Sequence, residues 1–389
     1  MRKGWEYKKL GEVGQIVTGS TPSTKDESNY SPREYCFVKP SDLPSQGIAD
    51  IEETEYFVSQ VGLSKSRVLP AGSVLVSCIG SIGKIGILTK EACSNQQINA
   101  IIPQDETDSR FIAYSLYAQR FVLESIANAP VVPIINKTDF SKIRIGIPPK
   151  STQLAIVSEL DKINELIRLK KEQLKDFDNL AQSLFYEMFG DPVENEKGWE
   201  VKKLNEIVSD NCSISYGIVQ PGDGVENGVP VVRPVDMTKT FVSRKGLKNT
   251  TKEISDSYKR TILKGNEILM CVRGTTGLIS MATPELQGCN VTRGIAPIEC
   301  GPTCDKWFVF YQILNPAIQH HIAEYTRGIA LKQINMKDVR DIPLCLPPLS
   351  LQRLFAQRIE QIEREKSEVL KSIQDLETLL ASRMQYWFE

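Results

Sequence analysis

The chain contains two copies of one long pattern. Residues 4–10 (GWEYKKL) return 194 positions later as residues 198–204 (GWEVKKL). A unit of this length is far longer than the roughly 20–45 residues of a solenoid repeat. The sequence therefore predicts a duplicated domain rather than an array of small repeats.

The match continues to the end of both copies with a small drift. Residues 37–43 (FVKPSDL) correspond to 231–237 (VVRPVDM), and residues 135–140 (INKTDF) correspond to 334–339 (INMKDV) at an offset of 199. Other matches are Cys78 with Cys271, Gly80 and Gly83 with Gly274 and Gly277, and Cys93 with Cys289 at an offset of 196. The drift indicates insertions in loops around a kept framework.

Each copy has two parts. The first part mixes short β-rich runs with one helical stretch, which we expect over about 109–127 in the first copy and 305–325 in the second. The second part begins after a Pro-Pro pair, which interrupts strands and helices. Ser151 and Ser350 stand where the N-cap of a following helix is expected.

The second part of each copy predicts a long amphipathic helix. Glycine and proline are absent from 151–189 and 350–389, and apolar residues recur there mostly in steps of four and three. This spacing is typical of a coiled-coil seam. Lys170 and Lys366 occupy seam positions, where lysine buries less apolar surface than leucine.

Such a helix is about 58 Å long and cannot bury its stripe within a small domain. Because both helices share one frame, we expect them to pair antiparallel within the chain; the alternative is two separate coiled coils with partner chains. The predicted fold class is α+β: two duplicated α/β domains separated by a pair of long antiparallel coiled-coil helices with pseudo-two-fold symmetry. The expected boundaries are 1–150 and 191–349 for the domains, and 151–190 and 350–389 for the helices.

Composition narrows the function classes. The net charge is −1, yet the two helical segments carry five basic against seven acidic residues and six against seven, so the rest of the chain is at +2. That balance permits nucleic-acid binding without demonstrating it. No run of about 18 apolar residues and no signal peptide occur, which predicts a cytoplasmic protein without a membrane partner.

Catalytic and metal motifs are not found. The nine cysteines do not form a disulfide framework, and Cys300 and Cys304 lack a second ligand pair, so we expect no metal and reduced, mostly buried thiols. GSIGK (80–84) has the wrong glycine spacing for a phosphate-binding loop. The only histidines are the adjacent His320 and His321, which excludes a plausible Ser-His-Asp set. The sequence predicts no catalytic residue and no cofactor.

The whole chain resembles the DNA-specificity subunits of type I restriction–modification enzymes. The resemblance lies in Trp5 and Leu10 followed by 19–22 (GSTP), in 145–149 (IGIPP) before a helix containing Gln153, in 214–222 (ISYGIVQPG), and in the linker 185–192 (FYEMFGDP). The family often has Glu-Gln after Pro-Pro, whereas this chain has Thr152-Gln153 and Leu351-Gln352.

The resemblance implies a reader of double-stranded DNA. Each domain would be a target-recognition domain for one half of a split site, and the helices would be the spacer. The helices would also dock two DNA-methyltransferase (modification) subunits, which methylate adenine N6 from S-adenosylmethionine. Restriction subunits that translocate DNA with ATP would join that core.

Candidate DNA contacts are polar or basic residues on the expected loops. In the first domain they are Thr18, Ser20, Thr21, Lys39, Ser81, Lys84, Gln96, Gln97 and Lys137. In the second domain they are Tyr216, Gln220, Arg233, Arg273, Thr275, Thr276, Arg293, Lys332 and Gln333.

Each candidate has the alternative of being merely solvated, and the four matched glycines form turns or allow close approach to phosphate. Because the framework repeats while the loop residues differ, the sequence predicts two different half-sites. The rival interpretations are a nuclease or methyltransferase that acts alone, and a scaffold that organises proteins without DNA.

Overall fold

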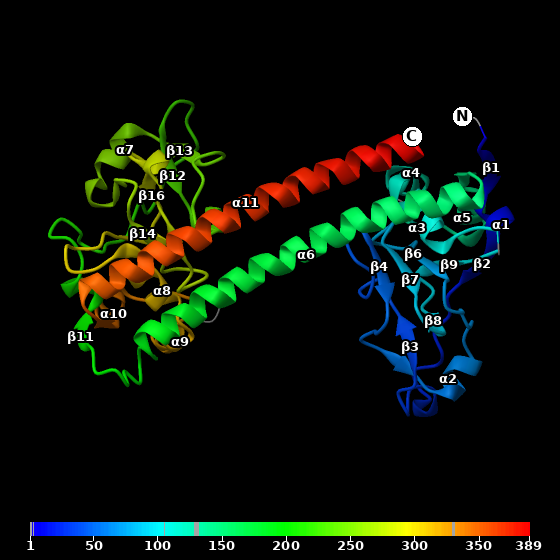
Figure 1. The fold of residues 1–389 in the computed structure, drawn as a ribbon, viewed down its shortest axis with the longest axis horizontal. Coiled ribbons are helices and arrows are strands. Elements are labelled where there is room, and N and C mark those ends of the chain that lie inside the picture. The colour runs from blue at the N-terminus through cyan, green and yellow to red at the C-terminus, as the bar shows by residue number, and fades with distance from the viewer. Residues whose placement is uncertain (1, 3, 105, 128–131, 329–330) are drawn as a thin grey trace. The chain divides into compact units, whose positions relative to one another are not determined.

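The computed structural model describes residues 1–389 except 1, 3, 105, 128–131 and 329–330. The chain forms two compact units, one of residues 1–171 with 372–389 and the other of residues 172–371. Each unit therefore contains one globular domain, part of the helix that follows it, and part of the other long helix (Figure 1).

The two long helices are α6 (Lys150–Phe189) and α11 (Leu349–Phe388), each of 40 residues. The expectation that Ser151 and Ser350 are N-caps is wrong, because both serines lie within the first helical turn. The helices start directly after the second proline, and the Pro149 carbonyl accepts the N–H of Thr152 at 2.8 Å. Proline has the backbone angle needed to enter a helix, so the Pro-Pro pair itself sets the start.

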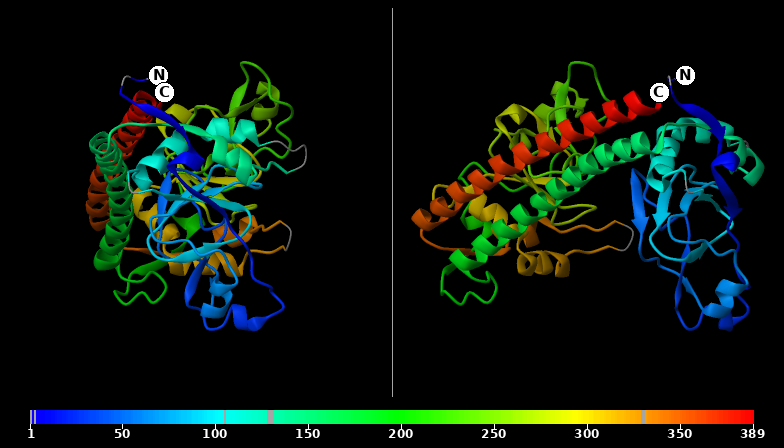
Figure 2. Two further views of the ribbon diagram at one scale, coloured as in Figure 1. Left: turned by 90° about the vertical axis from the view of Figure 1, so that its right-hand side faces the viewer. Right: turned by 45° about the vertical axis from the view of Figure 1, so that its right-hand side comes forward.

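The predicted antiparallel pairing of the helices is confirmed within each unit. In the first unit the start of α6 contacts the end of α11, where Ile156 and Leu160 share a core with Met384. In the second unit the end of α6 contacts the start of α11, where the Phe189 ring lies 5.4 Å from the Phe355 ring. Within each unit the two helix segments run side by side (Figures 1 and 2).

Lys366 makes ion pairs in the seam. Its Nζ lies 2.9 Å from Asp178 Oδ1 of α6 and 2.7 Å from Glu363 Oε1 of α11. Only 13% of the Lys366 side chain is exposed. The stripe therefore accommodates a lysine because two carboxylates neutralise it.

The first domain has two main sheets. The larger has the order β2-β9-β6-β7-β4, and the smaller has the order β5-β3-β8. The larger sheet comprises β2 (Gly14–Thr18), β9 (Ile98–Pro103), β6 (Val74–Ser77), β7 (Ile85–Leu88) and β4 (Ile48–Ile51). The smaller comprises β5 (Phe57–Val58), β3 (Tyr35–Val38) and β8 (Ala92–Ser94). A separate antiparallel pair joins β1 (Glu6–Lys9) to β10 (Arg144–Ile147), and short helices lie at α1 (Leu10–Val13), α2 (Gln60–Ser64) and α5 (Lys137–Lys142).

The second domain repeats this topology with smaller edges. Its sheets are β15-β14-β17 and β13-β12-β16, with β11 paired to β18. Where the first domain has edge strands β2 and β4, the second has single bridges, Val208 with Cys300 and Phe241 with Met281. The strands are β11 (Glu200–Lys203), β12 (Val229–Val232), β13 (Lys248–Thr250), β14 (Ile268–Cys271), β15 (Ile279–Met281), β16 (Asn290–Val291), β17 (Ile295–Ile298) and β18 (Pro343–Leu346). Short helices lie at α7 (Lys252–Asp256) and α10 (Met336–Arg340).

The single helix expected in each domain is wrong, because each stretch forms two helices. They are α3 (Ser109–Ala118) and α4 (Arg120–Ile126) in the first domain, and α8 (Lys306–Leu314) and α9 (Pro316–Glu324) in the second. Asn315 ends α8 and its side chain caps α9 by accepting the N–H of Ala317. Pro316 has no backbone N–H to donate within a continuing helix, so the Asn315-Pro316 pair causes the break between α8 and α9.

Candidate nucleic-acid interface

A pair of parallel strands positions the candidate loops in each domain. β3 pairs in parallel with β8, and β12 pairs in parallel with β16. The carboxyl ends of parallel strands meet at one edge, so the loops that follow them are neighbours. The N–H of Asn95 after β8 donates to the carbonyl of Val38 at the end of β3, over 3.0 Å.

The loop after β2 lies against the loop after β8. The N–H of Ser20 donates to the Ser94 carbonyl at 2.8 Å, and the Thr21 hydroxyl donates to Gln96 Oε1 at 2.6 Å. The side chain of Gln97 accepts a hydrogen bond from Asn95 at 2.8 Å. The structure therefore brings the first-domain candidates of residues 18–21 next to those of residues 96–97.

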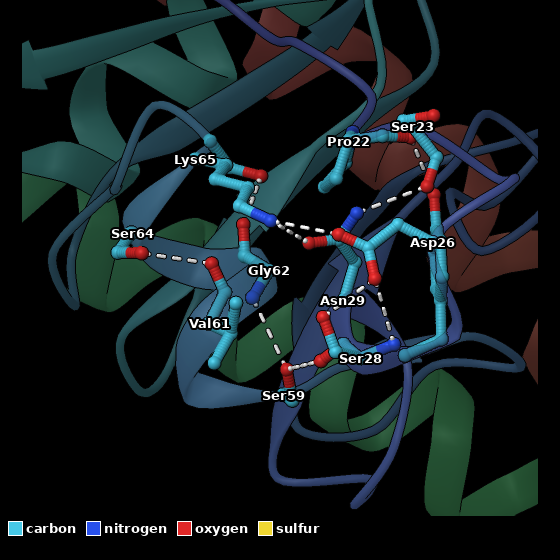
Figure 3. Close-up of polar contacts among 12 residues, drawn as sticks. Pro22, Ser23, Asp26, Ser28, Asn29, Ser59, Val61, Gly62, Ser64 and Lys65 are labelled. Atoms are coloured by element: carbon cyan, nitrogen blue, oxygen red, sulfur yellow. Dashed lines mark hydrogen bonds and ion pairs between the residues drawn. The ribbon is translucent and has the colours of Figure 1, made fainter.

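A polar cluster fixes the far side of this loop on α2 (Figure 3). Asn29 is fully buried, and its side-chain amide donates to the Ser23 carbonyl at 3.0 Å. Lys65 donates to Asn29 Oδ1 and forms an ion pair with Asp26, both at 2.9 Å. This cluster holds residues 22–30 against α2. The short segment 18–21 is therefore fixed at both ends, by β2 before it and by the cluster after it.

The β6–β7 hairpin brings further candidates to this edge. Lys84 Nζ donates to the Pro40 carbonyl at 3.1 Å, which ties the hairpin to the turn after β3. Ser81 is exposed at the hairpin, and Lys137 is exposed at the first residue of α5. An antiparallel β-bridge between Ile79 and Ile134 connects the hairpin to the segment that leads into α5.

The second domain repeats the arrangement with different residues. The N–H of Arg293 after β16 donates to the carbonyl of Ile218 at 2.7 Å, so the loop with Tyr216 and exposed Gln220 lies beside Arg293. The approach is so close that a Cβ on Gly217 would lie 2.1 Å from the Val291 carbonyl oxygen.

The β14–β15 hairpin of the second domain meets the segment before α10. The N–H of Gly274 donates to the Lys332 carbonyl at 2.8 Å, and the backbone of Arg273 forms an antiparallel β-bridge with that of Gln333. Thr275 is exposed, while Thr276 shares a 3.0 Å hydrogen bond with the hydroxyl of Thr326. Within the described residues, Arg273 Nε is buried and has no hydrogen-bond partner.

The four matched glycines have the backbone of turns. Gly80, Gly83, Gly274 and Gly277 all have φ between +77° and +87°. A Cβ on Gly83 would lie 3.0 Å from the Arg120 side chain, and a Cβ on Gly277 would lie 2.6 Å from Gln319. Among the described residues, nothing lies within 4 Å of a Cβ on Gly80 or Gly274. The second glycine of each hairpin thus lies close to a neighbouring side chain, whereas the first has no such neighbour in the described part of the chain.

Besides Lys84, the candidate cations Lys39 and Arg233 are held by intramolecular contacts. Lys39 Nζ lies 3.0 Å from the centre of the Tyr56 ring. Arg233 forms an ion pair with Asp236 at 2.7 Å, and the Asp236 hydrogen bond raises the Arg233 pKa further above its ordinary value. These contacts orient the two cations, and both remain half-buried.

Several residues near the loops were not selected from the sequence. Arg67 Nη1 donates to the Thr18 carbonyl at 2.8 Å, and the Arg67 backbone N–H donates to Ser20 Oγ at 3.2 Å. In the second domain Lys259 and Arg260 line a hollow of about 460 Å³ together with Tyr216. The 194 offset matches Lys65 with Lys259, so the repeated basic charge beside the first loop was available as a signal.

The matched cysteines lie in the core. Burial raises the pKa of Cys78 to about 12 and that of Cys93 to about 11, so both remain thiols at neutral pH. All nine cysteines are free, seven of them buried. Among the described residues no group of three or more His, Cys, Asp or Glu side chains is placed to hold a metal ion, and no helix is long and apolar enough to cross a membrane.

Comparison with known proteins identifies similar chains. The family model described as the type I restriction modification DNA specificity domain matches residues 2–176 and 196–378. The MjaIX type I restriction enzyme specificity subunit of Methanocaldococcus jannaschii is 23% identical over 96% of this chain and 91% of its own length. The HindI specificity subunit of Haemophilus influenzae is 30% identical over 52% of this chain and 40% of its own length.

Two solved structures share the fold. A chain from a study of complex assembly and conformational transition of the type I R-M system has a TM-score of 0.61 at 19% identity, covering 100% of this chain and 98% of that chain. The type I restriction–modification S subunit of M. genitalium has a TM-score of 0.56 at 14% identity, covering 98% and 95%.

Proposed function

This chain belongs to the family of type I restriction–modification DNA specificity subunits, and we propose that it reads a bipartite, asymmetric site on double-stranded DNA. Residues 1–150 and 191–349 are the two target-recognition domains, each for one half-site. Residues 151–190 and 350–389 form the spacer. The chain itself carries no catalytic residue or cofactor in this proposal.

The observation that carries the proposal is one loop framework built twice with different side chains. The loop after β8 presents Gln96 and Gln97, whereas the loop after β16 presents Arg293. Glutamine suits adenine in the major groove and arginine suits guanine or phosphate. Two readers of different chemistry on a common scaffold recognise two different half-sites.

The helix pair supports docking of partner subunits. Leu166 and Leu169 of α6 and Leu370 of α11 have 46–48% of their surface exposed, beyond the seam that joins the helices. Leu180 and Leu379, which match at the 199 offset, are both exposed as well. In this proposal two modification subunits bind the helices and methylate adenine, and restriction subunits join that complex.

The proposal is tested by methylome sequencing of cells that contain this chain together with its modification subunit. We expect adenine methylation at one interrupted, non-palindromic sequence, and two copies of the methyltransferase per chain in the purified complex. Thr21→Ala should alter only one half of that sequence, while Thr24→Ala, nearby in the same loop, is the matched control. Methyl transfer by the purified chain alone would contradict the non-catalytic role. A partner complex with no affinity for specific DNA would favour the scaffold interpretation.

A further inference from the structure

One turn has the same construction in both domains. It follows β3 as Lys39-Pro40-Ser41-Asp42 and follows β12 as Arg233-Pro234-Val235-Asp236. The aspartate accepts the N–H of the first residue at 2.7 Å in the first domain and at 2.8 Å in the second. The aspartate N–H in turn donates to the carbonyl of the first residue at 3.0 and 2.9 Å. Because proline also fixes its own φ, the turn is a rigid support in both copies.

The third residue is the one that this turn presents to solvent. The first residue is occupied, Lys39 by the Tyr56 ring and Arg233 by Asp236. Ser41 is exposed, and Val235 has 70% of its surface exposed. Framework and capping are kept between the domains, while a hydroxyl is replaced by an apolar side chain.

The turn lies among the other candidate loops. A Cβ on Gly294 would lie 2.8 Å from Pro234 Cγ, so the turn with Val235 adjoins the loop that carries Arg293. In the first domain Lys84 donates to the Pro40 carbonyl, beside Ser41. Both turns thus sit at the strand edge where the candidate DNA contacts gather.

We propose that residues 41 and 235 are base-reading positions, and that Val235 contacts the 5-methyl group of a thymine in the second half-site. This inference rests on the proposed function. The thymine methyl is the apolar group on the major-groove edge of a base pair, and it accounts for an exposed valine on a rigid support. The Ser41 hydroxyl, a donor and an acceptor, reads a polar base edge at the matched position of the first half-site.

The test removes one methyl group from the DNA and one side chain from the protein. The full chain, assembled with its modification subunits, is titrated with duplexes in which each thymine of the second half-site is replaced in turn by deoxyuridine. We expect one position at which deoxyuridine weakens binding by about fourfold, the effect of leaving one methyl group unburied. With Val235→Ala the same replacement should change affinity by less than about twofold.

The matched control is Val193→Ala, which truncates a valine of the same unit that is 56% exposed and lies in the linker after α6. It should leave the deoxyuridine effect intact. Ser41→Val should change the methylated sequence at one position of the first half-site only.

The outcomes separate the inference from the proposed function. If the complex reads the second half-site but every deoxyuridine affects Val235→Ala as it affects the unaltered chain, the base-reading role of Val235 is wrong and the proposed function stands. A second half-site without any A·T pair also overturns the thymine contact. If the unaltered complex shows no preference for any sequence, the proposed function fails together with the inference.

Discussion

The side-chain oxygen of Gln153 accepts a 2.9 Å hydrogen bond from the backbone N–H of Asp108. Its amide nitrogen donates to the Pro148 carbonyl at 2.9 Å. Gln352 makes the same two contacts, with Asp305 at 2.9 Å and Pro347 at 2.8 Å. Since Asp108 and Asp305 cap α3 and α8, one buried amide joins the start of each long helix to a helix of the adjoining domain.

Replacing either glutamine should destabilise the chain. Gln153→Leu and Gln352→Leu would each leave buried backbone donors and acceptors without a partner. We expect each variant to lower the free energy of unfolding by about 2 kcal/mol. Chemical denaturation measures the loss, and amide exchange at Asp108 or Asp305 should accelerate in the matching variant. Gln182→Leu changes an exposed glutamine of α6 and serves as control. Equal stability of all three variants would contradict the structural role of the buried amides.

Lys366 should stabilise the helix pair through its charge. Burial lowers its pKa, but the hydrogen bonds and charges of Glu363 and Asp178 outweigh burial and raise the pKa above the ordinary value. Lys366→Met leaves Glu363 largely buried without a counter-charge, so we expect a loss of about 2–3 kcal/mol at pH 7. The exposed Lys371→Met is the matched control.

The pH dependence of the Lys366 contribution has a defined sign. Because the folded pKa is raised, the contribution is complete below the unfolded value of about 10.4 and is lost as the pH rises through the folded pKa. The difference in unfolding free energy between the unaltered chain and Lys366→Met should therefore stay constant from pH 7 to about 9 and shrink only at more alkaline pH. A difference that disappears already by pH 8 would exclude the charged lysine as its source.

The sequence was informative where a pattern recurs and weak where a single residue decides the geometry. The helix pair followed from the absence of glycine and proline and from a shared apolar frame. The break between α8 and α9 was missed because helical spacing continues across Asn315 and Pro316. The contacts of Gln153 with Asp108 and of Gln352 with Asp305 could not be predicted, since each partner is a backbone N–H more than 40 positions away.

The cysteine match illustrates a register error. β3 pairs Phe37 with Cys93, whereas β12 pairs Val231 with Asn290. Since Phe37 matches Val231, the structural counterpart of Cys93 is Asn290, and Cys289 precedes it by one residue. Matching the two cysteines by residue type was therefore a weaker guide than strand pairing, because a small buried cysteine fits at more than one position along such a strand.

In the candidate interface, the sequence predicted which loops carry the candidate contacts but not which of their side chains face solvent. Lys39 and Arg233 carry a positive charge at matched positions of the two copies. Their partners Tyr56 and Asp236 become visible only in the folded turn, as does the exposure of Val235. Which loop residue faces solvent depends on backbone capping, which composition does not encode.

The hairpin glycines should differ in their tolerance of a side chain. Gly277→Ala places a Cβ 2.6 Å from Gln319, whereas the Cβ of Gly274→Ala meets no described residue within 4 Å and brings only the strain of positive φ. We expect a cost of about 1 kcal/mol for Gly274→Ala, from the backbone strain alone. Gly277→Ala should lower the stability by at least as much, and by more if the Gln319 side chain cannot move aside. Thermal denaturation of the two variants measures the difference. If Gly274→Ala keeps its stability but loses DNA affinity, close approach to phosphate is the role of that glycine.

Arg273 should contribute to the second half-site. Within the described part of the chain its Nε is a buried donor without a partner, and DNA supplies the acceptor if the guanidinium turns outward on binding. If it reads a base, Arg273→Ala costs about 1–3 kcal/mol of discrimination and relaxes specificity in that half-site alone. If it anchors a phosphate, affinity falls for all sequences and the salt dependence decreases by about one counterion. Binding titrations of the assembled complex at several salt concentrations distinguish these results, and unchanged binding would remove Arg273 from the interface.

The end of α6 should be able to take the place of the end of α11 against the first domain. In the first unit Phe388 of α11 lies 5.7 Å from Phe111, and in the second unit the matched Phe189 of α6 lies 4.7 Å from Phe308. The ion pairs across the seam are also related, because Glu377, which binds Lys171, matches Asp178, which binds Lys366. The end of α6 therefore carries an aromatic ring and a carboxylate at the matched positions, while Leu184 and Met188 stand where Arg383 and Trp387 of α11 bind Glu159.

A chain of residues 1–190 should consequently form a homodimer, with Phe189 of one copy taking the place of Phe388 against Phe111 of the other. An isologous dimer presents two identical readers, so its DNA site must share the two-fold symmetry. With modification subunits it should methylate an interrupted palindrome built from the first half-site, and light scattering should report a dimer. Phe189→Asp would place a charge in that apolar contact and should abolish dimerisation, whereas Tyr186→Asp changes an exposed residue one turn earlier and should not. A folded monomer of 1–190, or an assembly that still requires the asymmetric site, would show that the helix ends are not interchangeable.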